Sequence, residues 1–194
     1  MQHRIGLREK KRQRVLETVH QMAVTLFTKQ GYDVVSMEDI AKASGISRST
    51  LFRHFATKEA TVLHDNLDPI LLDVFRNQPT NITTIQALRN TLHDVLLQSS
   101  TTKEGRLHEQ RYNLIRTVPQ LRIAILQESA KTGAMLIELV AERTQRPVDD
   151  VTVCTLANAL MGIAVGIVFS LSKKEDYLTR FDQALQQLEA GFVI

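Results

Sequence analysis

The chain has 194 residues, with 24 Lys and Arg against 21 Asp and Glu, and a formal net charge of +3. That length can bury a core as one long domain or two short ones. A single cysteine, Cys154, excludes an internal disulfide and a cysteine-rich metal site, and it indicates a reducing, cytoplasmic compartment. Strand signals are weak, because no alternation of β-branched residues is sustained, so the sequence favours an all-α fold.

Net positive charge is concentrated in the N-terminal third of the chain. Residues 1–60 hold 11 Lys and Arg against 6 Asp and Glu, whereas residues 61–194 hold 13 against 15. A basic first third on a weakly acidic remainder is typical of a nucleic-acid-binding head on a body that does not bind nucleic acid. Basic residues near a terminus also occur on solvated arms that have no partner. The asymmetry therefore supports a DNA-binding head without deciding it.

The first predicted helix runs from about Leu7 to Lys29. Apolar residues recur along it at helical spacing and are expected to form the core side of a three-helix head. They are Val15, Val19, Met22, Ala23, Leu26 and Phe27. Gly31 ends the helix.

Two short helices follow. Ser36 and Asp39 have the spacing of a capping box, which predicts the start of the first of them. Gly45 interrupts that helix in a left-handed turn, and Ser47 caps the second helix, residues 48–54. Two short helices joined by such a turn form a helix-turn-helix, whose second helix enters the major groove of DNA. A surface hairpin with solvated charges is the alternative.

The rest of the chain is predicted to be helical as well. A helix capped by Thr57 continues to about Arg76, and Pro69 is expected to bend or split it. Beyond residues 77–80 we expect five more helices, which makes about nine in all. Their expected ranges are 82–98, 103–116, 120–145, 148–171 and 176–191.

Residues 151–172 carry no charge over 22 residues, which is the length of a membrane span. Gly162 and Gly166 have the GxxxG spacing of membrane helix pairs. The alternative is a helix buried on both sides, by its own domain and by a partner subunit. We favour burial and expect no membrane, because amphipathic helices flank the segment and polar residues interrupt it. Those residues are Thr152, Thr155, Asn158, Ser170 and Ser172.

Catalytic and cofactor motifs are missing from the sequence. It contains no Walker, GxGxxG, GxSxG, HExxH or CxxC motif, and no two of its six His residues have metal-ligand spacing on one helix. Asp149 and Asp150 precede a predicted helix, where the helix dipole stabilises carboxylates, so we assign them a structural role. We therefore expect a protein that is not an enzyme and holds no cofactor or metal.

Residues 12–63 resemble the DNA-binding domain of the tetracycline-repressor (TetR) family of bacterial transcription regulators. The matching pieces are Phe27…Gly31-Tyr32, Ser36-Met37…Asp39-Ile40-Ala41 and Ser44-Gly45-Ile46-Ser47…Thr50-Leu51-Phe52…Phe55…Lys58-Glu59. Ser49 stands where Gly is frequent in the family, and Phe52 where Tyr is frequent. The Tyr hydroxyl often holds a phosphate, so no polar role is expected of Phe52. The resemblance implies a DNA-binding domain at residues 1–56 and an effector-binding and dimerisation domain at residues 57–194.

The resemblance also implies which residues contact DNA. Those expected at base edges, or between bases and phosphate, are Arg48, Ser49, Thr50 and Arg53. Those expected at phosphate are Ser36, His54 and Lys58. Arginine suits base recognition, because its fork reaches guanine O6 and N7 together. Arg4, Arg8 and Arg12 are expected to follow the DNA backbone or the minor groove as a disordered arm, and an idle surface is the alternative.

The C-terminal domains of the family usually enclose an effector cavity and form a homodimer through their last two helices. Polar residues that interrupt apolar helices are the candidate ligand contacts here, although a structural hydrogen bond or plain exposure is the alternative for each. They are His93, Arg116, Gln127 and Asn158, with Arg111, Asn113 and Thr155 beside them. The helix layout is somewhat similar to that of family members that sense acyl-CoA-like molecules.

The expected function is a ligand-responsive repressor that binds a palindromic operator in double-stranded DNA as a homodimer. Its small-molecule effector is unknown, and acyl-CoA-like chemistry is one expectation. Two alternatives stay open at this stage. One is a helical small-molecule-binding protein or enzyme with a vestigial DNA-binding head, and the other is a regulator tethered to the membrane by residues 151–172.

Overall fold

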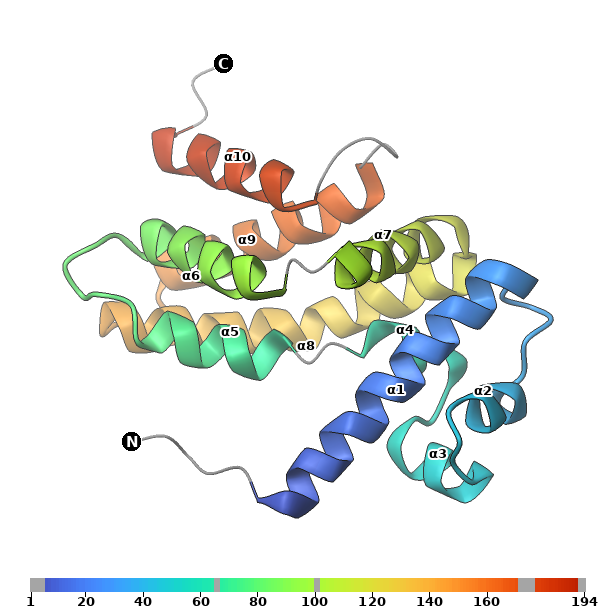
Figure 1. Cartoon of the computed structure of the whole chain (residues 1–194). Helices are drawn as coiled ribbons and strands as arrows, with labels where there is room; N and C mark the ends of the chain where they lie inside the picture. The colour runs from blue at the N-terminus through green and yellow to red at the C-terminus, as the bar shows by residue number, and fades with distance from the viewer. Residues whose placement is uncertain (1–5, 65–66, 100–101, 171–176, 192–194) are drawn as a thin grey trace. The chain divides into compact units, whose positions relative to one another are not determined.

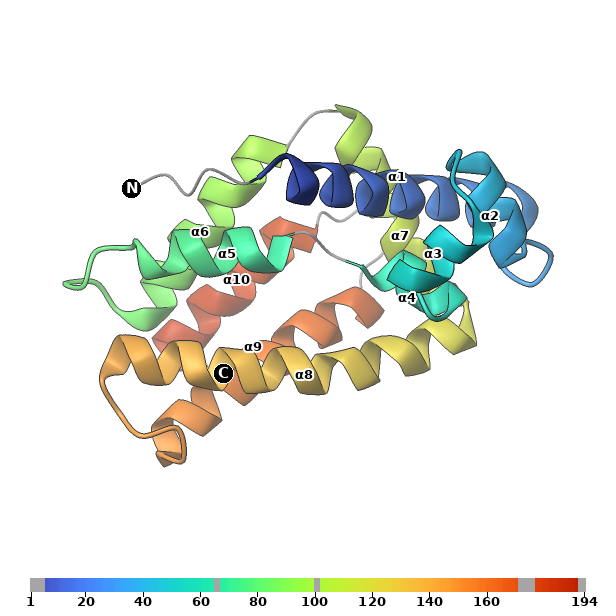
Figure 2. The same ribbon diagram turned by 90° about the horizontal axis from the view of Figure 1, so that it is seen from below.

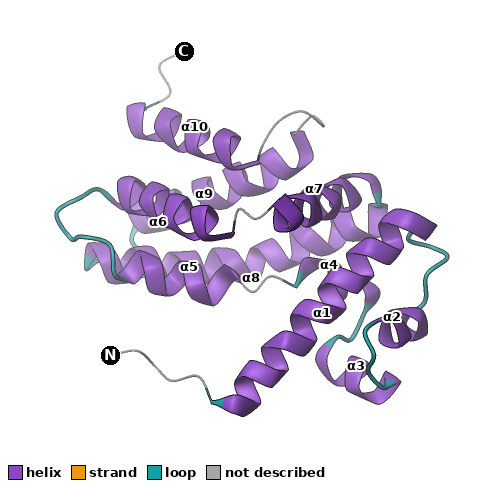
Figure 3. Cartoon of the chain, in the orientation of Figure 1, coloured by secondary structure: helices purple, strands orange, loops and turns teal. Residues whose placement is uncertain are grey.

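The structure is a computed structural model that describes residues 6–64, 67–99, 102–170 and 177–191 (Figure 1). These residues form ten α-helices and no strand, which confirms the all-α prediction (Figure 3). The helices are α1 (Leu7–Gln30), α2 (Met37–Ala43), α3 (Arg48–His54), α4 (Lys58–Leu63), α5 (Leu67–Arg76), α6 (Thr84–Ser99), α7 (Thr102–Thr117), α8 (Pro119–Thr144), α9 (Val151–Ser170) and α10 (Tyr177–Ala190).

The chain divides into two compact units. The first unit contains residues 1–66 and 102–124, and the second contains residues 67–101 and 125–194. Helix α7, which the sequence assigned to the C-terminal body, therefore packs with the N-terminal helices. The functional boundary between residues 56 and 57 stays a prediction.

In the first unit, α1 packs against α2, α4 and α7, and α2 packs against α3 (Figure 2). Val19, Ala23 and Phe27 of α1 are buried, as predicted, whereas the other three apolar residues predicted for this core are only half-buried. Ile40 of α2 and Leu51 of α3 are fully buried. Burying several such side chains, at about 1.5–3 kcal/mol each, is what holds these short helices in place.

The helix predicted from Thr57 to Arg76 is in fact two helices. The prediction of a split is confirmed, but Pro69 is not where the helix breaks: α4 ends at Leu63, and Pro69 lies in the first turn of α5. Amides of the first helical turn have no partner within the helix, so the missing N–H of proline costs nothing there. The count therefore rises from nine helices to ten.

The second unit has an apolar core shared by all of its helices. Phe75 of α5 and Ala87 of α6 pack with Leu139 of α8, while Leu160 of α9 packs with Phe181 of α10. An ion-pair cluster supports this core: Arg89 on α6 lies 2.7 Å from Asp182 and 3.5 Å from Glu189, both on α10. The five helices thus form one packed body.

Helix α9 begins three residues later than predicted, because Asp150 caps it. The Asp150 Oδ1 accepts hydrogen bonds from the amides of Thr152, at 2.8 Å, and Val153, at 3.2 Å. These bonds lower the pKa of Asp150, the one from Val153 most, so its carboxylate stays ionised. The structural role predicted for Asp150 is therefore confirmed.

Among the described residues, only one face of α9 is covered. Val153, Ala157, Leu160 and Val168 are buried. The opposite face is exposed and carries Thr155, Asn158, Gly162 and Gly166. Of the helices described, α9 alone is long and apolar enough to cross a membrane, and 22% of its most apolar window is buried. Burial by its own domain is confirmed for one face of α9, and burial of the other face by a partner subunit stays a prediction.

Candidate nucleic-acid interface

The start of α2 is held by the predicted capping box. The amide and hydroxyl of Ser36 donate to Asp39 Oδ2 at 2.9 and 2.6 Å, and the Asp39 amide donates to Ser36 Oγ at 3.1 Å. These bonds, the one from the Ser36 hydroxyl most, lower the pKa of Asp39. The Ser36 hydroxyl hydrogen is thus given to a carboxylate, and binding a phosphate through it would require exchanging that bond.

Gly45 makes the turn between α2 and α3. Its φ of +66° lies in the left-handed region, which only glycine adopts without strain, as predicted. The amide of Gly45 donates to the Lys42 carbonyl, and that of Ile46 to the Ala41 carbonyl, both at 3.1 Å. This is the hydrogen-bond pattern of a Schellman-type helix end, and it sets the direction in which α3 leaves α2.

Ser47 caps α3 and gathers hydroxyl groups at its start. The Ser47 Oγ accepts from the Thr50 amide at 3.1 Å, and lies 3.0 Å from Ser49 Oγ and 2.8 Å from Thr50 Oγ1. The structure therefore brings Ser49 and Thr50, both predicted to contact DNA, to one point at the beginning of α3. Ser49 is exposed and Thr50 is half-buried.

Arg48 is exposed, as predicted, but it has two neighbours that were not predicted. Its Nε lies 2.9 Å from Glu38 Oε1 on α2, and its guanidinium carbon lies 5.4 Å from the centroid of the Phe52 ring. Helix α3 itself contains no acidic residue, so its sequence predicts an exposed face without a negative charge. The acidic group comes from the neighbouring helix, where only the angle between the two helices could reveal it.

The end of α3 joins a group of basic residues. Arg53 is exposed and His54 is half-buried. Burial lowers the pKa of His54, and the positive charges of Arg53 and of Arg12 on α1 lower it further. Arg12 therefore lies within electrostatic reach of α3, and His54 is mainly neutral at pH 7.

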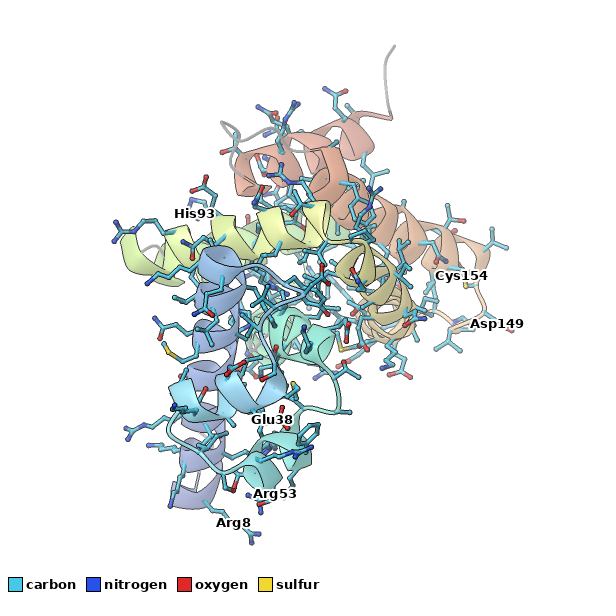
Figure 4. All side chains as sticks on the ribbon, turned by 90° about the vertical axis from the view of Figure 1, so that its right-hand side faces the viewer. Arg8, Glu38, Arg53, His93, Asp149 and Cys154 are labelled. Carbon is cyan, nitrogen blue, oxygen red and sulfur yellow. The ribbon has the colours of Figure 1, made fainter. Side chains whose placement is uncertain are left out.

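The predicted basic arm needs correction. Arg8 and Arg12 belong to α1 and are exposed one helical turn apart, so they are part of a helix and not of a disordered arm. Figure 4 shows Arg8 and Arg53 at the same end of the first unit. Arg4 lies outside the described residues.

Lys58 has partners inside the protein. Its Nζ donates to the Tyr32 carbonyl at 2.6 Å and lies over the rings of Tyr32 and Phe27, at 4.4 and 5.6 Å from their centroids. The Tyr32 hydroxyl donates to Glu59 Oε1. Burial raises the pKa of Tyr32, and Glu59 raises it further. Because an ammonium group has three N–H donors, two of those of Lys58 are left for a phosphate.

The four residues predicted to contact an effector lie on four different helices, and their role stays a prediction. His93 on α6, Gln127 on α8 and Asn158 on α9 are exposed, and Asn158 donates back to its own helix, to the Cys154 carbonyl at 2.8 Å. Arg116 belongs to the first unit and donates to Asn113 Oδ1 at 3.3 Å.

Arg111, a further candidate for effector contact, makes the structural hydrogen bonds that were the alternative for it. It is only 7% exposed, and from α7 it donates to the carbonyls of Val62, at 3.0 Å, and Leu63, at 3.3 Å. These residues end α4, where carbonyls have no partner within the helix. The described residues contain no group of three or more His, Cys, Asp or Glu side chains that could hold a metal ion.

A helix-turn-helix on an N-terminal helical unit, followed by a second helical unit, defines the class of DNA-binding transcription regulators. Two family models match the chain: "Bacterial regulatory proteins, tetR family" over residues 21–63, and "MftR C-terminal domain" over residues 82–193. The chain therefore belongs to the TetR family of bacterial transcription regulators, and the resemblance stated from the sequence is confirmed.

Two relatives of similar sequence agree with this membership. The chain is 30% identical over 193 residues to the HTH-type transcriptional regulator TcmR of Streptomyces glaucescens, a match that covers 96% of this chain and 83% of TcmR. It is also 30% identical over 154 residues to the "Putative mycofactocin biosynthesis transcriptional regulator MftR" of Mycobacterium tuberculosis, and this match covers 76% of this chain and 74% of MftR. The prediction of a DNA-binding transcription regulator is confirmed.

Solved structures share the fold. Thermus thermophilus FadR, a TetR-family repressor solved with lauroyl-CoA, superposes with a TM-score of 0.58 at 20% identity, over 92% of this chain and 95% of FadR. NalD of Pseudomonas aeruginosa, a repressor of a multidrug efflux pump, gives a TM-score of 0.51 at 18% identity, over 94% and 97%. At these identities the two structures support the fold alone.

Proposed function

We propose that the chain is a cytoplasmic, ligand-responsive repressor that binds a palindromic DNA operator as a homodimer, with α3 in the major groove. The observation that carries the proposal is the exposed face of α3. Arg48, Ser49 and Arg53 lie on that face, and the Gly45 turn and the Ser47 cap hold its helix rigidly on the first unit.

Phosphate contacts would flank this face. Arg12 of α1 and His54 of α3 supply one group, and Lys58 supplies another at the start of α4. Such contacts place the protein on the duplex without reading its sequence, whereas Arg48 and Arg53 would read base edges. Ser36 completes the proposed phosphate set at the start of α2.

The homodimer would form on the exposed face of α9. Thr155, Asn158, Gly162 and Gly166 follow one another at helical spacing, and their small side chains allow a second helix to approach closely. A twofold partner would bury this otherwise uncovered apolar helix. It would also present two copies of α3 to successive major grooves, about 34–36 Å apart.

The test is selection of DNA from random pools, followed by affinity measurements. The proposal expects a palindromic consensus, and it expects Arg48→Ala and Arg53→Ala each to weaken the selected operator by about 1–3 kcal/mol. Lys131→Ala, in the second unit, is the matched control for loss of one positive charge. If both arginine variants bind as the parent does, α3 is not the recognition helix.

An effector test follows from linkage. The first ligand to try is an acyl-CoA, since FadR was solved with lauroyl-CoA. A ligand that favours the non-binding state should lower operator affinity by about 5–150-fold, and the operator must then lower ligand affinity by the same factor. Equal ligand affinities with and without operator would show that the ligand does not act as a switch.

A further inference from the structure

We infer that Glu38 and Phe52 are positioning residues that hold Arg48 for the recognition of a single guanine, and so set the specificity of the protein at that base pair. The inference rests on the proposed function, because it assumes that α3 lies in the major groove. It adds two residues to the interface, one of which is acidic and carried by a different helix.

The guanidinium of Arg48 is held from two sides. Glu38 Oε1 on α2 lies 2.9 Å from its Nε, and the ring of Phe52, one turn further along α3, lies 5.4 Å from its central carbon. The ion pair draws the guanidinium towards α2, and the aromatic ring offers it a face on which to lie. An arginine on an exposed helix otherwise moves among many rotamers. The two contacts restrict Arg48 before DNA binds, so less side-chain entropy is lost when it binds a base.

The pairing also leaves the recognition end of Arg48 available. An arginine has one N–H on Nε and four on its two Nη atoms. The ion pair with Glu38 engages Nε, so the Nη groups can still donate to guanine O6 and N7. Glu38 therefore supports guanine recognition without competing for the same donors.

Core packing does not explain either neighbour. Phe52 is 41% exposed, and the side chain of Glu38 is 51% exposed. A carboxylate near DNA repels phosphate and weakens binding to every sequence. The first turn of α2 suits a carboxylate through the helix dipole, and this alone accounts for its presence there but not for its pairing with Arg48. In the proposed role, a correctly paired Arg48 offsets the repulsion only where a guanine is present.

The experiment compares affinities for the selected operator and for its three substitutions at each guanine contact. It uses the full-length parent and the single variants Glu38→Gln, Phe52→Leu, Phe52→Tyr and Arg48→Ala. The double variant Glu38→Gln/Arg48→Ala is compared with Arg48→Ala. Asp33→Asn, which removes one exposed negative charge elsewhere in the first unit, is the matched control. Discrimination is a ratio of affinities within one preparation, so partial unfolding does not change it, and absolute affinities are compared after active-site titration of each variant with DNA.

We expect Glu38→Gln and Phe52→Leu to reduce discrimination by roughly 10-fold at the same single base pair, within the range of one bidentate contact. Phe52→Tyr, which keeps the ring, should keep the discrimination. In the Arg48→Ala background, Glu38→Gln should leave the preference at that base pair unchanged.

Two outcomes separate this inference from the proposed function. If Glu38→Gln strengthens binding to all sequences by one factor, as Asp33→Asn does, with discrimination intact, then Glu38 contributes only charge and the inference is overturned. If the parent selects no DNA sequence at all, the proposed function fails and the inference fails with it.

Discussion

The ammonium group of Lys58 donates to the carbonyl of Tyr32 at 2.6 Å, and this bond joins the start of α4 to the turn that follows α1. The same side chain lies over two aromatic rings of that region. Lys58 is expected to hold a DNA phosphate, and it also joins two segments of the first unit. The two roles can be separated by experiment.

We expect Lys58→Ala to affect stability and DNA binding together. Loss of a charge-assisted hydrogen bond in a half-buried site should lower the free energy of unfolding by about 1–2 kcal/mol. Loss of a phosphate contact should reduce the slope of log affinity against log salt by about one. Urea denaturation and a salt series of anisotropy titrations measure the two effects, with exposed Lys42→Ala as the control. A lower stability with an unchanged salt slope would assign Lys58 to structure alone.

DNA binding is expected to strengthen as the pH falls. Burial, Arg53 and Arg12 hold the pKa of His54 below its usual 6.5, so the free protein carries a neutral imidazole near pH 7. A phosphate beside His54 would favour the charged form and raise that pKa, so the complex would take up a proton. Operator affinity should therefore rise between about pH 7.5 and 5.5, by up to about tenfold per pH unit.

The control for that pH dependence is His54→Gln, which keeps a hydrogen-bond donor but cannot titrate. Its operator affinity should be nearly independent of pH over the same range. The stability of the free protein should move in the opposite sense. Because the folded pKa of His54 is depressed, its contribution is present above about pH 6.5 and is lost as the pH falls through the folded value. Equal pH profiles for parent and variant would remove His54 from the DNA interface.

Features that depend on a few neighbouring residues could be predicted from the sequence, whereas contacts between distant residues could not. Ser36, Gly45 and Ser47 were assigned correctly because a cap or a left-handed turn is decided within four residues of chain. The Glu38–Arg48 ion pair was missed because it depends on how two helices cross. A spacing pattern carries no information on that angle.

Effector candidates show the same limit. Asn158 is a polar residue in an apolar helix, and that pattern cannot tell which face of the helix is buried; in the structure Asn158 lies on the exposed face. Arg111 was chosen in the same way, yet its partner Val62 lies 49 residues earlier in the chain. Polarity within an apolar helix therefore indicated an interaction without indicating its kind.

Substitutions on α9 should separate folding from dimerisation. A Cβ built on Gly162 or Gly166 meets no atom within 4 Å, so the single chain can accept a larger side chain at either position. We expect Gly166→Leu to keep helicity and monomer stability, since leucine is a better helix former than glycine by roughly 0.8 kcal/mol, but to weaken a closely packed dimer. Gly166→Arg should give monomers or insoluble protein.

Sedimentation equilibrium measures the monomer–dimer equilibrium of each variant. Ser170→Ala, at the edge of the same face of α9, is the control. A parent that is a folded monomer at micromolar concentration would contradict the dimer. Parent protein that pellets with membranes on fractionation of cells would favour the membrane-spanning alternative for α9 instead.

Arg111 is expected to be one of the most sensitive positions of the first unit. It is nearly buried and donates from α7 to the carbonyls of Val62 and Leu63, which end α4. Arg111→Met keeps much of the volume but leaves both carbonyls without this partner, so it should lower the free energy of unfolding by about 1–3 kcal/mol. The stability of Arg111→Lys, which keeps the charge but not the planar fork, should fall between that of Arg111→Met and that of the parent.

Urea denaturation at one fixed protein concentration measures the series, and exposed Arg106→Met on the same helix is the control. If Arg111→Met and Arg106→Met are equally stable, the guanidinium does not cap α4, and the packing of α7 against α1 alone accounts for its place in the first unit.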